Sequence, residues 1–152
     1  MRKSYYNPEF HHRRSIRLSK YNYASSGAYM ITICTFKKEP FFDVPVLRAI
    51  LEETWLELPQ RFKKLQLDEF VIMSDHVHFI VWLDAEVEKE IELGTIVGAY
   101  KSLTHVKWSR LIRAKSLQGY QKLWQRNYVE HIIRNDSELA QKRAYIRNNP
   151  LK

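Results

Sequence analysis

The sequence has 152 residues, a length typical of one domain rather than two. Apolar residues make up 45% of it and aromatic residues 13%, which is enough for a folded core and excludes an intrinsically disordered chain. Lysine and arginine number 25 against 17 acidic residues. The resulting charge of +8 is typical of a domain with a polyanionic partner, either nucleic acid or an anionic membrane.

Neither secretion nor a membrane span is indicated. The longest apolar run, Phe79 to Leu83, is far shorter than the roughly 20 residues of a spanning helix. The first twenty residues are basic and contain no apolar segment of a signal peptide. Cys34 is the single cysteine, so no disulfide can form within the chain. We therefore expect a cytoplasmic protein without a membrane partner.

The N-terminal part of the sequence predicts an arm, a strand and a helix. A polar, basic arm over 1–26 is expected to precede one domain over 27–152. The domain begins with a β-branched and aromatic stretch, 28–36, that predicts a strand. Apolar residues at helical spacing predict a helix over 46–64, which Pro59 is expected to shorten or kink.

The middle of the sequence predicts a hairpin and a second helix. Alternating residues predict strands over 67–73 and 76–83, joined by a Ser-Asp turn. The acidic stretch 84–92 is expected to form a loop or a solvated edge. A helix over 95–115 then has one apolar face and one basic face.

The last elements complete a recognisable order. A fourth strand is expected over 123–133, followed by a helix that has Ser137 as its N-cap and ends before Pro150. The order β-α-β-β-α-β-α predicts an α+β fold of the ferredoxin-like, split βαβ type, with two helices on one face of an antiparallel sheet. A C-terminal helix is appended to it. This fold hosts many functions and indicates no chemistry by itself.

The third predicted strand carries two histidines, His76 and His78, separated by one residue. Positions two apart in a strand point to the same face, about 6.6 Å apart, so the two imidazoles could hold one ion. Ile80 and Trp82 continue this face, where unpartnered imidazoles would be costly to bury. The alternative is a pair of ordinary strand histidines bonded to their neighbours.

The last predicted helix places Tyr145 and Asn149 one turn apart on one face, with Gln141 one turn earlier. Leu139 and Ile146 mark a different stripe that is expected to face the core. Tyr145 thus lies beside the apolar stripe and has polar neighbours along its own face. The alternative is a tyrosine at the core's edge that packs its ring and hydrates its hydroxyl.

Together these residues predict attack by a tyrosine on a phosphate. A tyrosine hydroxyl, with a pKa of about 10, is a weak nucleophile unless its target is polarised. A divalent ion held by His76, His78 and Asn149 could align and neutralise the phosphate that Tyr145 attacks. Two imidazoles and an amide favour manganese by affinity, although cellular availability could make magnesium the working ion.

The sequence resembles the single-tyrosine transposases of the IS200-like superfamily, whose His-hydrophobic-His (HUH) signature matches Met73 to Val81. It is most similar to the REP-associated branch, and the likeness extends from about Arg13 to the end of the chain. The further matching blocks are Arg13–Leu18 with Gly27–Thr35, Leu93–Ser102, Leu123–Arg134 and Tyr145–Pro150.

The resemblance implies an endonuclease and strand transferase that acts on single-stranded DNA beside small hairpins and requires magnesium or manganese. His76 and His78 match the metal-binding pair, and Asn149 matches the residue that completes the metal site. Tyr145 matches the nucleophile, which becomes linked to a DNA 5′-phosphate and leaves a free 3′-hydroxyl. A homodimer is possible as well, because insertion-sequence members share active sites between subunits whereas REP-associated members can act as monomers.

Three other residues are candidates for lining the site. Asp75 could orient the neighbouring imidazole, although aspartate is common in turns for backbone reasons. His131 could contact phosphate or base, and a purely structural role is the alternative. Gln141 is a candidate because it lies on the same helix face as Tyr145, one turn earlier. Tyr128 and Tyr100 are alternative nucleophiles that rank below Tyr145.

Basic residues in two regions are expected to bind the DNA backbone, because cations follow phosphates and interleaved aromatic rings can stack on bases. The first region is the N-terminal arm, for which a solvated tail is the alternative. The second is the basic face of the 95–115 helix with the segment after it. The candidates are Arg13, Arg14, Arg17, Lys101, Ser102 and Arg126.

Two functional hypotheses therefore remain. The first is a metal-dependent DNA strand transferase that uses Tyr145. The second is a non-catalytic module that binds single-stranded nucleic acid on the same fold, or a domesticated regulator. An RNA-recognition sheet would carry aromatic blocks, whereas the strand at 76–83 carries histidines, which favours the first hypothesis.

Overall fold

The computed structural model describes residues 27–84, 89–114 and 122–149. The arm expected over 1–26, with its candidates Arg13, Arg14 and Arg17, lies outside these residues. Within the described part of the chain, no helix is both long enough and apolar enough to cross a bilayer.

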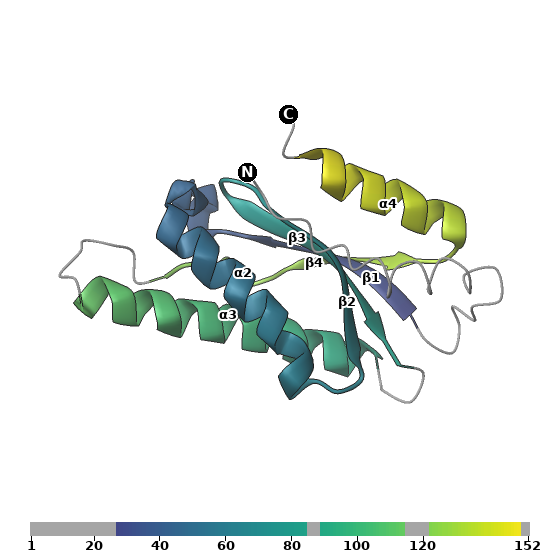
Figure 1. Cartoon of the computed structure of the whole chain (residues 1–152), viewed down its shortest axis with the longest axis horizontal. Coiled ribbons are helices and arrows are strands. Elements are labelled where there is room, and N and C mark those ends of the chain that lie inside the picture. Colours follow the sequence, from purple (N-terminus) through teal and green to yellow (C-terminus); the bar gives the residue numbers. More distant parts are fainter. Residues whose placement is uncertain (1–26, 85–88, 115–121, 150–152) are drawn as a thin grey trace.

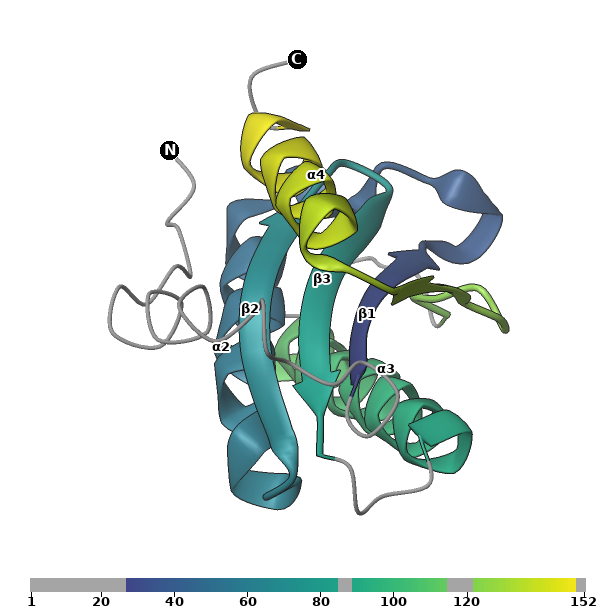
Figure 2. The ribbon, with the colours of Figure 1, turned by 90° about the vertical axis from the view of Figure 1, so that its right-hand side faces the viewer.

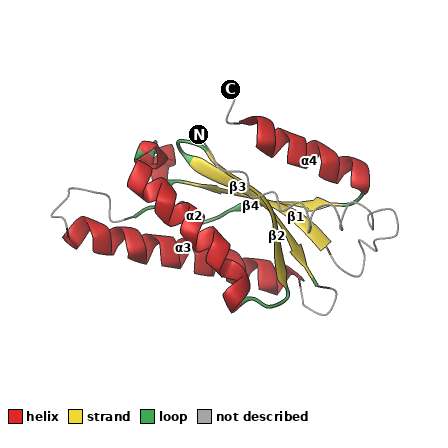
Figure 3. Ribbon diagram, viewed as in Figure 1, coloured by secondary structure: helices red, strands yellow, loops and turns green. Residues whose placement is uncertain are grey.

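In the described residues, four strands and three helices follow one another in the predicted order, with two short 3-10 turns after the first strand (Figure 3). The elements are β1 (Gly27–Cys34), η2 (Phe36–Lys38), η3 (Phe41–Asp43), α2 (Pro45–Arg61), β2 (Leu65–Ile72), β3 (His76–Leu83), α3 (Lys89–Ala114), β4 (Val129–Ile133) and α4 (Asp136–Asn148).

The strands form one antiparallel sheet in the order β2-β3-β1-β4, which confirms the ferredoxin-like α+β fold. Helices α2 and α3 cover one face of this sheet (Figure 1). Helix α4 lies across the other face, over β2 and β3 (Figure 2). The sheet is therefore enclosed between two unequal layers.

The alternation of β3 divides the core between these layers. Val77, Phe79 and Val81 belong to the larger cluster, on the side of α2 and α3, where the Trp55 ring lies 4.8 Å from the Phe79 ring. Ile80 and Trp82 belong to the smaller cluster, on the side of α4. Because strand residues alternate between faces, the histidines at even positions must also face α4.

The starts of α3 and of the fourth strand differ from the expected boundaries. Helix α3 begins at Lys89, so part of the stretch expected to be a loop is helical. Its lysine and glutamates are good helix formers, and the buried stripe already includes Leu93. Helix α2 runs two residues past Pro59 and ends at Arg61, so the helix is shortened, as expected from Pro59.

The fourth strand begins at Val129 instead of residue 123. Leu123 and Trp124 are both buried, and consecutive residues of a strand cannot both face the same layer. Trp124 accordingly forms only an isolated bridge with Thr35.

The N-cap of α4 is Asn135 rather than Ser137. The Asn135 side chain accepts a hydrogen bond of 2.8 Å from the Glu138 amide, and the Glu138 carboxylate accepts one of 2.9 Å from the Arg134 amide. This reciprocal arrangement satisfies amides that have no partner within the helix, and it holds the pKa of Glu138 below its usual value.

Candidate active site

The two histidines lie at the start of β3 and face α4. His76 pairs with Cys34 of β1, and His78 pairs with Thr32 of β1 on one side and Val71 of β2 on the other. His78 is buried and His76 is half-buried. The hairpin turn between β2 and β3 thus places both rings at one end of the sheet.

The imidazoles converge through their Nε2 atoms, which lie 3.1 Å apart. The outer nitrogens are each held by a neighbour. His76 Nδ1 lies 2.6 Å from the Asp75 carboxylate, and His78 Nδ1 lies 2.8 Å from the Thr32 hydroxyl. A carboxylate accepts hydrogen bonds, so Asp75 holds the Nδ1 side of the His76 ring and orients Nε2 toward His78.

His78 remains neutral at physiological pH. Burial, followed by the nearby charges of His76 and Lys142, lowers the pKa of His78 to about 4. Neutral imidazole is the form that binds metal ions. The surroundings of His78 therefore keep its imidazole neutral, which is the form that can bind a metal ion.

This donor set fits a divalent ion. A metal bound about 2.1 Å from each of two imidazole nitrogens at cis or tetrahedral angles requires the nitrogens to be about 3.0–3.4 Å apart, which is the separation found. The described residues contain no group of three His, Cys, Asp or Glu side chains that could hold a metal. A further ligand from the described residues would thus be of another type.

Asn149, which carries an amide, is the candidate of another type that the sequence predicts. It is the C-cap of α4, only 6% exposed, and its Nδ2 atom has no hydrogen-bond partner among the described residues. Its Nδ2 atom is a hydrogen-bond donor, so only the Oδ1 atom of the same amide could bind a metal ion. A set of one amide oxygen and two imidazoles is compatible with manganese or magnesium.

Tyr145 lies beside this pair. Its ring centre is 5.4 Å from that of His78 at an interplanar angle of 69°, an edge-to-face contact. The residue is 45% exposed, whereas Leu139 and Ile146 of the same helix are fully buried. The predicted separation between the core stripe of α4 and its tyrosine face is confirmed.

A buried ion pair docks α4 on the sheet. Arg143 donates to both Asp68 oxygens, from Nε at 2.9 Å and from Nη2 at 2.6 Å, and the Trp82 indole donates to Asp68 at 2.9 Å. Asp68 is fully buried and Arg143 is only 7% exposed. Bidentate pairing fixes the orientation of the guanidinium, and hence the rotation of α4 about its axis.

A second pair acts one turn later, where Arg147 donates to the buried Glu69 carboxylate at 2.9 and 3.1 Å. Consecutive strand residues normally face opposite ways, but a β-bulge places Asp68 and Glu69 together opposite the single residue Ile80. Both carboxylates therefore reach α4, and Tyr145 lies between the two arginines along the helix.

Sequence reasoning missed these four charged residues. The available signal was an Asp-Glu pair inside an otherwise apolar strand, together with arginines four apart on the last helix. Neither pattern predicts a partner without knowledge of which strand α4 covers.

The geometry can now be compared with known proteins. The model of the IS200-like transposase family matches residues 23–149. The chain belongs to this family. An uncharacterized protein of Haemophilus influenzae is 36% identical to it, over 96% of this chain and 92% of the relative.

Two solved structures share the fold of this IS200-like transposase. A REP-associated tyrosine transposase bound to a REP hairpin superimposes with a TM-score of 0.58 at 18% identity, covering 82% of this chain and 67% of that one. A proposed transposase of Deinococcus radiodurans gives a TM-score of 0.58 at 17% identity, covering 84% and 94%. At these identities the likeness shows the fold alone.

The other lining candidates are distributed differently in this transposase. Asp75 contacts His76, as described above. Gln141 is exposed on α4, one turn before Tyr145. His131 pairs with Met30 of β1 and lies 3.3 Å from the Glu138 carboxylate in the first turn of α4, away from the histidine pair. The structure thus places His131 at the start of α4.

The alternative tyrosines do not lie at the histidine pair. Tyr100 is fully buried, donates a hydrogen bond of 3.0 Å to the Leu51 carbonyl, and has its pKa raised by burial. Tyr128 packs against the cluster on the opposite face of the sheet, and burial and Glu130 raise its pKa. Raised pKa values disfavour the phenolate in both cases.

The DNA-binding candidates of the described chain form a group of their own. Lys101 of α3 donates a hydrogen bond of 2.9 Å to the Arg126 carbonyl, and Ser102 is exposed beside it. These residues lie on the α3 side of the sheet, so they do not contact the histidines.

Proposed function

We propose that this transposase cuts and rejoins single-stranded DNA, with Tyr145 as the nucleophile and His76, His78 and Asn149 as the residues that hold a divalent ion. The observation that supports this proposal most is the edge-to-face contact between the partly exposed Tyr145 and the buried, neutral His78. This ring contact supports the assignment of Tyr145, because the two Nε2 atoms nearby have a separation that suits a metal ion.

In the proposed reaction the Tyr145 Oη atom forms a bond to the phosphorus, and the bond from phosphorus to the 3′-oxygen breaks. The phenol loses its proton, and the departing oxygen gains one to become a free 3′-hydroxyl. Bound magnesium or manganese supplies charge neutralisation at the phosphate. The 5′-phosphotyrosine link retains the energy of the original bond, so the 3′-hydroxyl of another strand can reverse the step.

The residues of the chain fix the geometry of this step. Asp75 and Thr32 orient the imidazoles through their outer nitrogens, and such outer contacts are a usual requirement of metal sites. The arginine pairs of α4 hold the tyrosine over the rings. All these residues belong to one chain, so the proposed chemistry does not need a second copy, although a homodimer is compatible with it.

The proposed substrate is single-stranded DNA next to a hairpin. The net charge of +8 favours a polyanion, and Lys101, Ser102 and Arg126 are proposed as backbone contacts, together with Arg13, Arg14 and Arg17 of the arm. The hypothesis of an RNA-recognition module is disfavoured, because α4 covers the sheet face on which such a module would stack bases (Figure 2).

A denaturing gel tests the proposal. Hairpin oligonucleotides with single-stranded flanks, including genomic sequences that border the gene, carry a label at the 3′ end. We expect a covalent protein–DNA band with manganese or magnesium, none with EDTA, and none with Tyr145→Phe. Tyr128→Phe serves as the matched control and should keep the band. A band that persists in Tyr145→Phe or in EDTA would contradict the mechanism.

A further inference from the structure

The turn that follows β1 lies against the hairpin of the histidine pair. The Thr35 amide donates a hydrogen bond of 2.9 Å to the Asp75 carbonyl, and the Phe36 amide donates one of 2.9 Å to the Leu123 carbonyl. The short η2 turn therefore connects the end of the sheet that carries the histidines with the segment that precedes β4.

This turn has a strained backbone. Lys37 and Lys38 have φ values of 55° and 54°, a left-handed conformation that side chains with a Cβ atom rarely adopt, least of all twice in succession. The Thr35 hydroxyl donates a hydrogen bond of 2.7 Å to the Glu39 carbonyl and so closes the turn. Backbone strain of this kind is concentrated at ligand-binding sites, where the surrounding structure enforces it.

Lysines from three separate parts of the chain gather here. The ammonium groups of Lys37 and Lys122 lie 5.3 Å and 4.9 Å from the centre of the Phe36 ring, within the range of cation–π contacts. Lys101 of α3 is close enough to Lys122 that this neighbour, after burial, lowers the Lys101 pKa. We call Lys37, Lys101 and Lys122 the lysine cluster.

No carboxylate of the described residues compensates the positive charge of the lysine cluster. None of its members forms an ion pair with a carboxylate of the described residues. Lys107, two turns further along α3, shows the contrast, because its ammonium lies 3.0 Å from Glu57 and 3.9 Å from Glu53. Like charges held together without a counter-charge favour an anionic ligand.

A depression beside the cluster offers space for that ligand. Its volume is about 520 Å³, and Lys101, Lys122, Ser102 and His105 contribute the polar part of its lining, with Trp124 among the apolar part. The Phe36 ring already contacts two ammonium groups, those of Lys37 and Lys122. We therefore assign it to holding the lysines in place and not to stacking on a base.

We propose that the lysine cluster is a second phosphate-binding subsite, which holds the backbone of single-stranded DNA where it continues past the histidine pair. This inference rests on the proposed function. The cations come from η2, α3 and the segment before β4, so they form a track rather than one pocket, and a track suits a polyanionic strand better than a single free anion.

Salt dependence of DNA binding tests the subsite. Fluorescence anisotropy of a labelled hairpin with single-stranded flanks gives Kd at several salt concentrations. For single strands, each lost phosphate contact lowers the slope of log Kd against log salt by about 0.7, so Lys37→Gln with Lys122→Gln should lower it by about 1.4. Replacing the same two lysines by arginine retains the charges and should preserve the slope.

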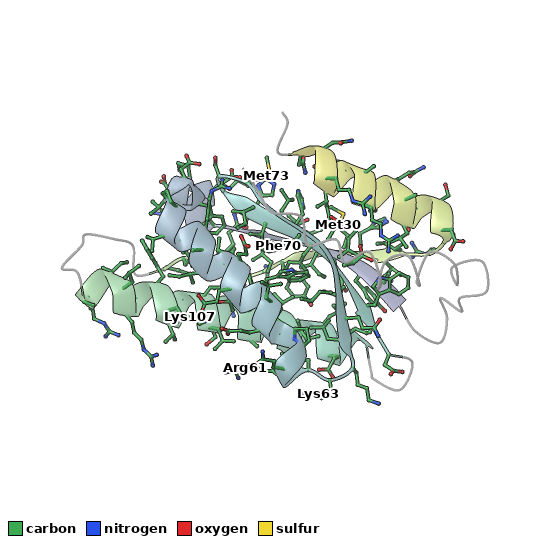
Figure 4. All side chains as sticks on the ribbon, in the orientation of Figure 1. Met30, Arg61, Lys63, Phe70, Met73 and Lys107 are labelled. Carbon is green, nitrogen blue, oxygen red and sulfur yellow. The ribbon has the colours of Figure 1, made fainter. Side chains whose placement is uncertain are left out.

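The matched control removes two exposed charges elsewhere. Figure 4 shows Arg61 and Lys63 on the side of the molecule opposite to Met73, and Arg61→Gln with Lys63→Gln should leave the slope as in the wild type. Equal slopes for the two glutamine doubles, with unchanged thermal unfolding, would overturn the subsite. Formation of the covalent DNA adduct by the wild-type protein tests the proposed function separately. That assay does not use the slope of log Kd against log salt.

Discussion

Replacing Arg143 with methionine leaves the Asp68 carboxylate inside the protein without its cation. Asp68 is fully buried, and the change removes both hydrogen bonds from Arg143 while the Trp82 indole, at 2.9 Å, still donates to it. Breaking a buried ion pair by removing one partner costs about 3–5 kcal/mol. With a urea slope of about 2 kcal/mol per molar, the unfolding midpoint should fall by about 1.5–2.5 M.

The double variant Asp68→Asn with Arg143→Met separates the charge from the loss of packing. It removes the stranded charge and keeps an acceptor for Trp82, and the remaining unsatisfied amide costs about 1–3 kcal/mol. The double variant should therefore be about 2 kcal/mol more stable than Arg143→Met alone. Arg110→Met, the same change at an exposed site, should stay within about 0.5 kcal/mol of the wild type.

Urea unfolding followed by circular dichroism measures all these variants. A loss below about 1 kcal/mol for Arg143→Met, or a double variant no more stable than the single one, would refute the role assigned to the pair. Since Arg143 and Arg147 flank Tyr145 on α4, the single variant should also slow the formation of the covalent DNA adduct under conditions in which the protein is folded.

The remaining predictions concern the metal site and the cap of α4. Thr32→Val removes the partner of His78 Nδ1 and should weaken manganese binding in calorimetry about 10–100-fold; unchanged affinity would contradict the orienting role. Manganese at 100 times its Kd should stabilise the wild type by about 2.7 kcal/mol in thermal unfolding, and His78→Ala should abolish the effect. Asn135→Ala should cost about 1 kcal/mol and Ser137→Ala less than about 0.5, so equal losses would speak against the observed cap.

Several features of the site were predictable because they depend on short-range periodicity. The alternation of β3 placed His76 and His78 on one face, and the helical spacing of α4 separated Tyr145 from its buried neighbours. The errors arose where tertiary contacts decide a boundary. Because Leu123 and Trp124 are both buried, the fourth strand begins later than expected, at Val129. Asn135 rather than Ser137 caps the last helix.

The sequence by itself thus determined the order of the elements, the fold class and the residues that share a face within one strand or one helix, since these follow from repeats of two and of 3.6 residues. Only the tertiary structure decided which faces meet. The contact of Tyr145 with His78, the ion pair of Asp68 with Arg143 and the lysine cluster around Phe36 each join distant parts of the chain. Such contacts depend on strand order, on the bulge in β2 and on the face that α4 covers, and no local pattern encodes these.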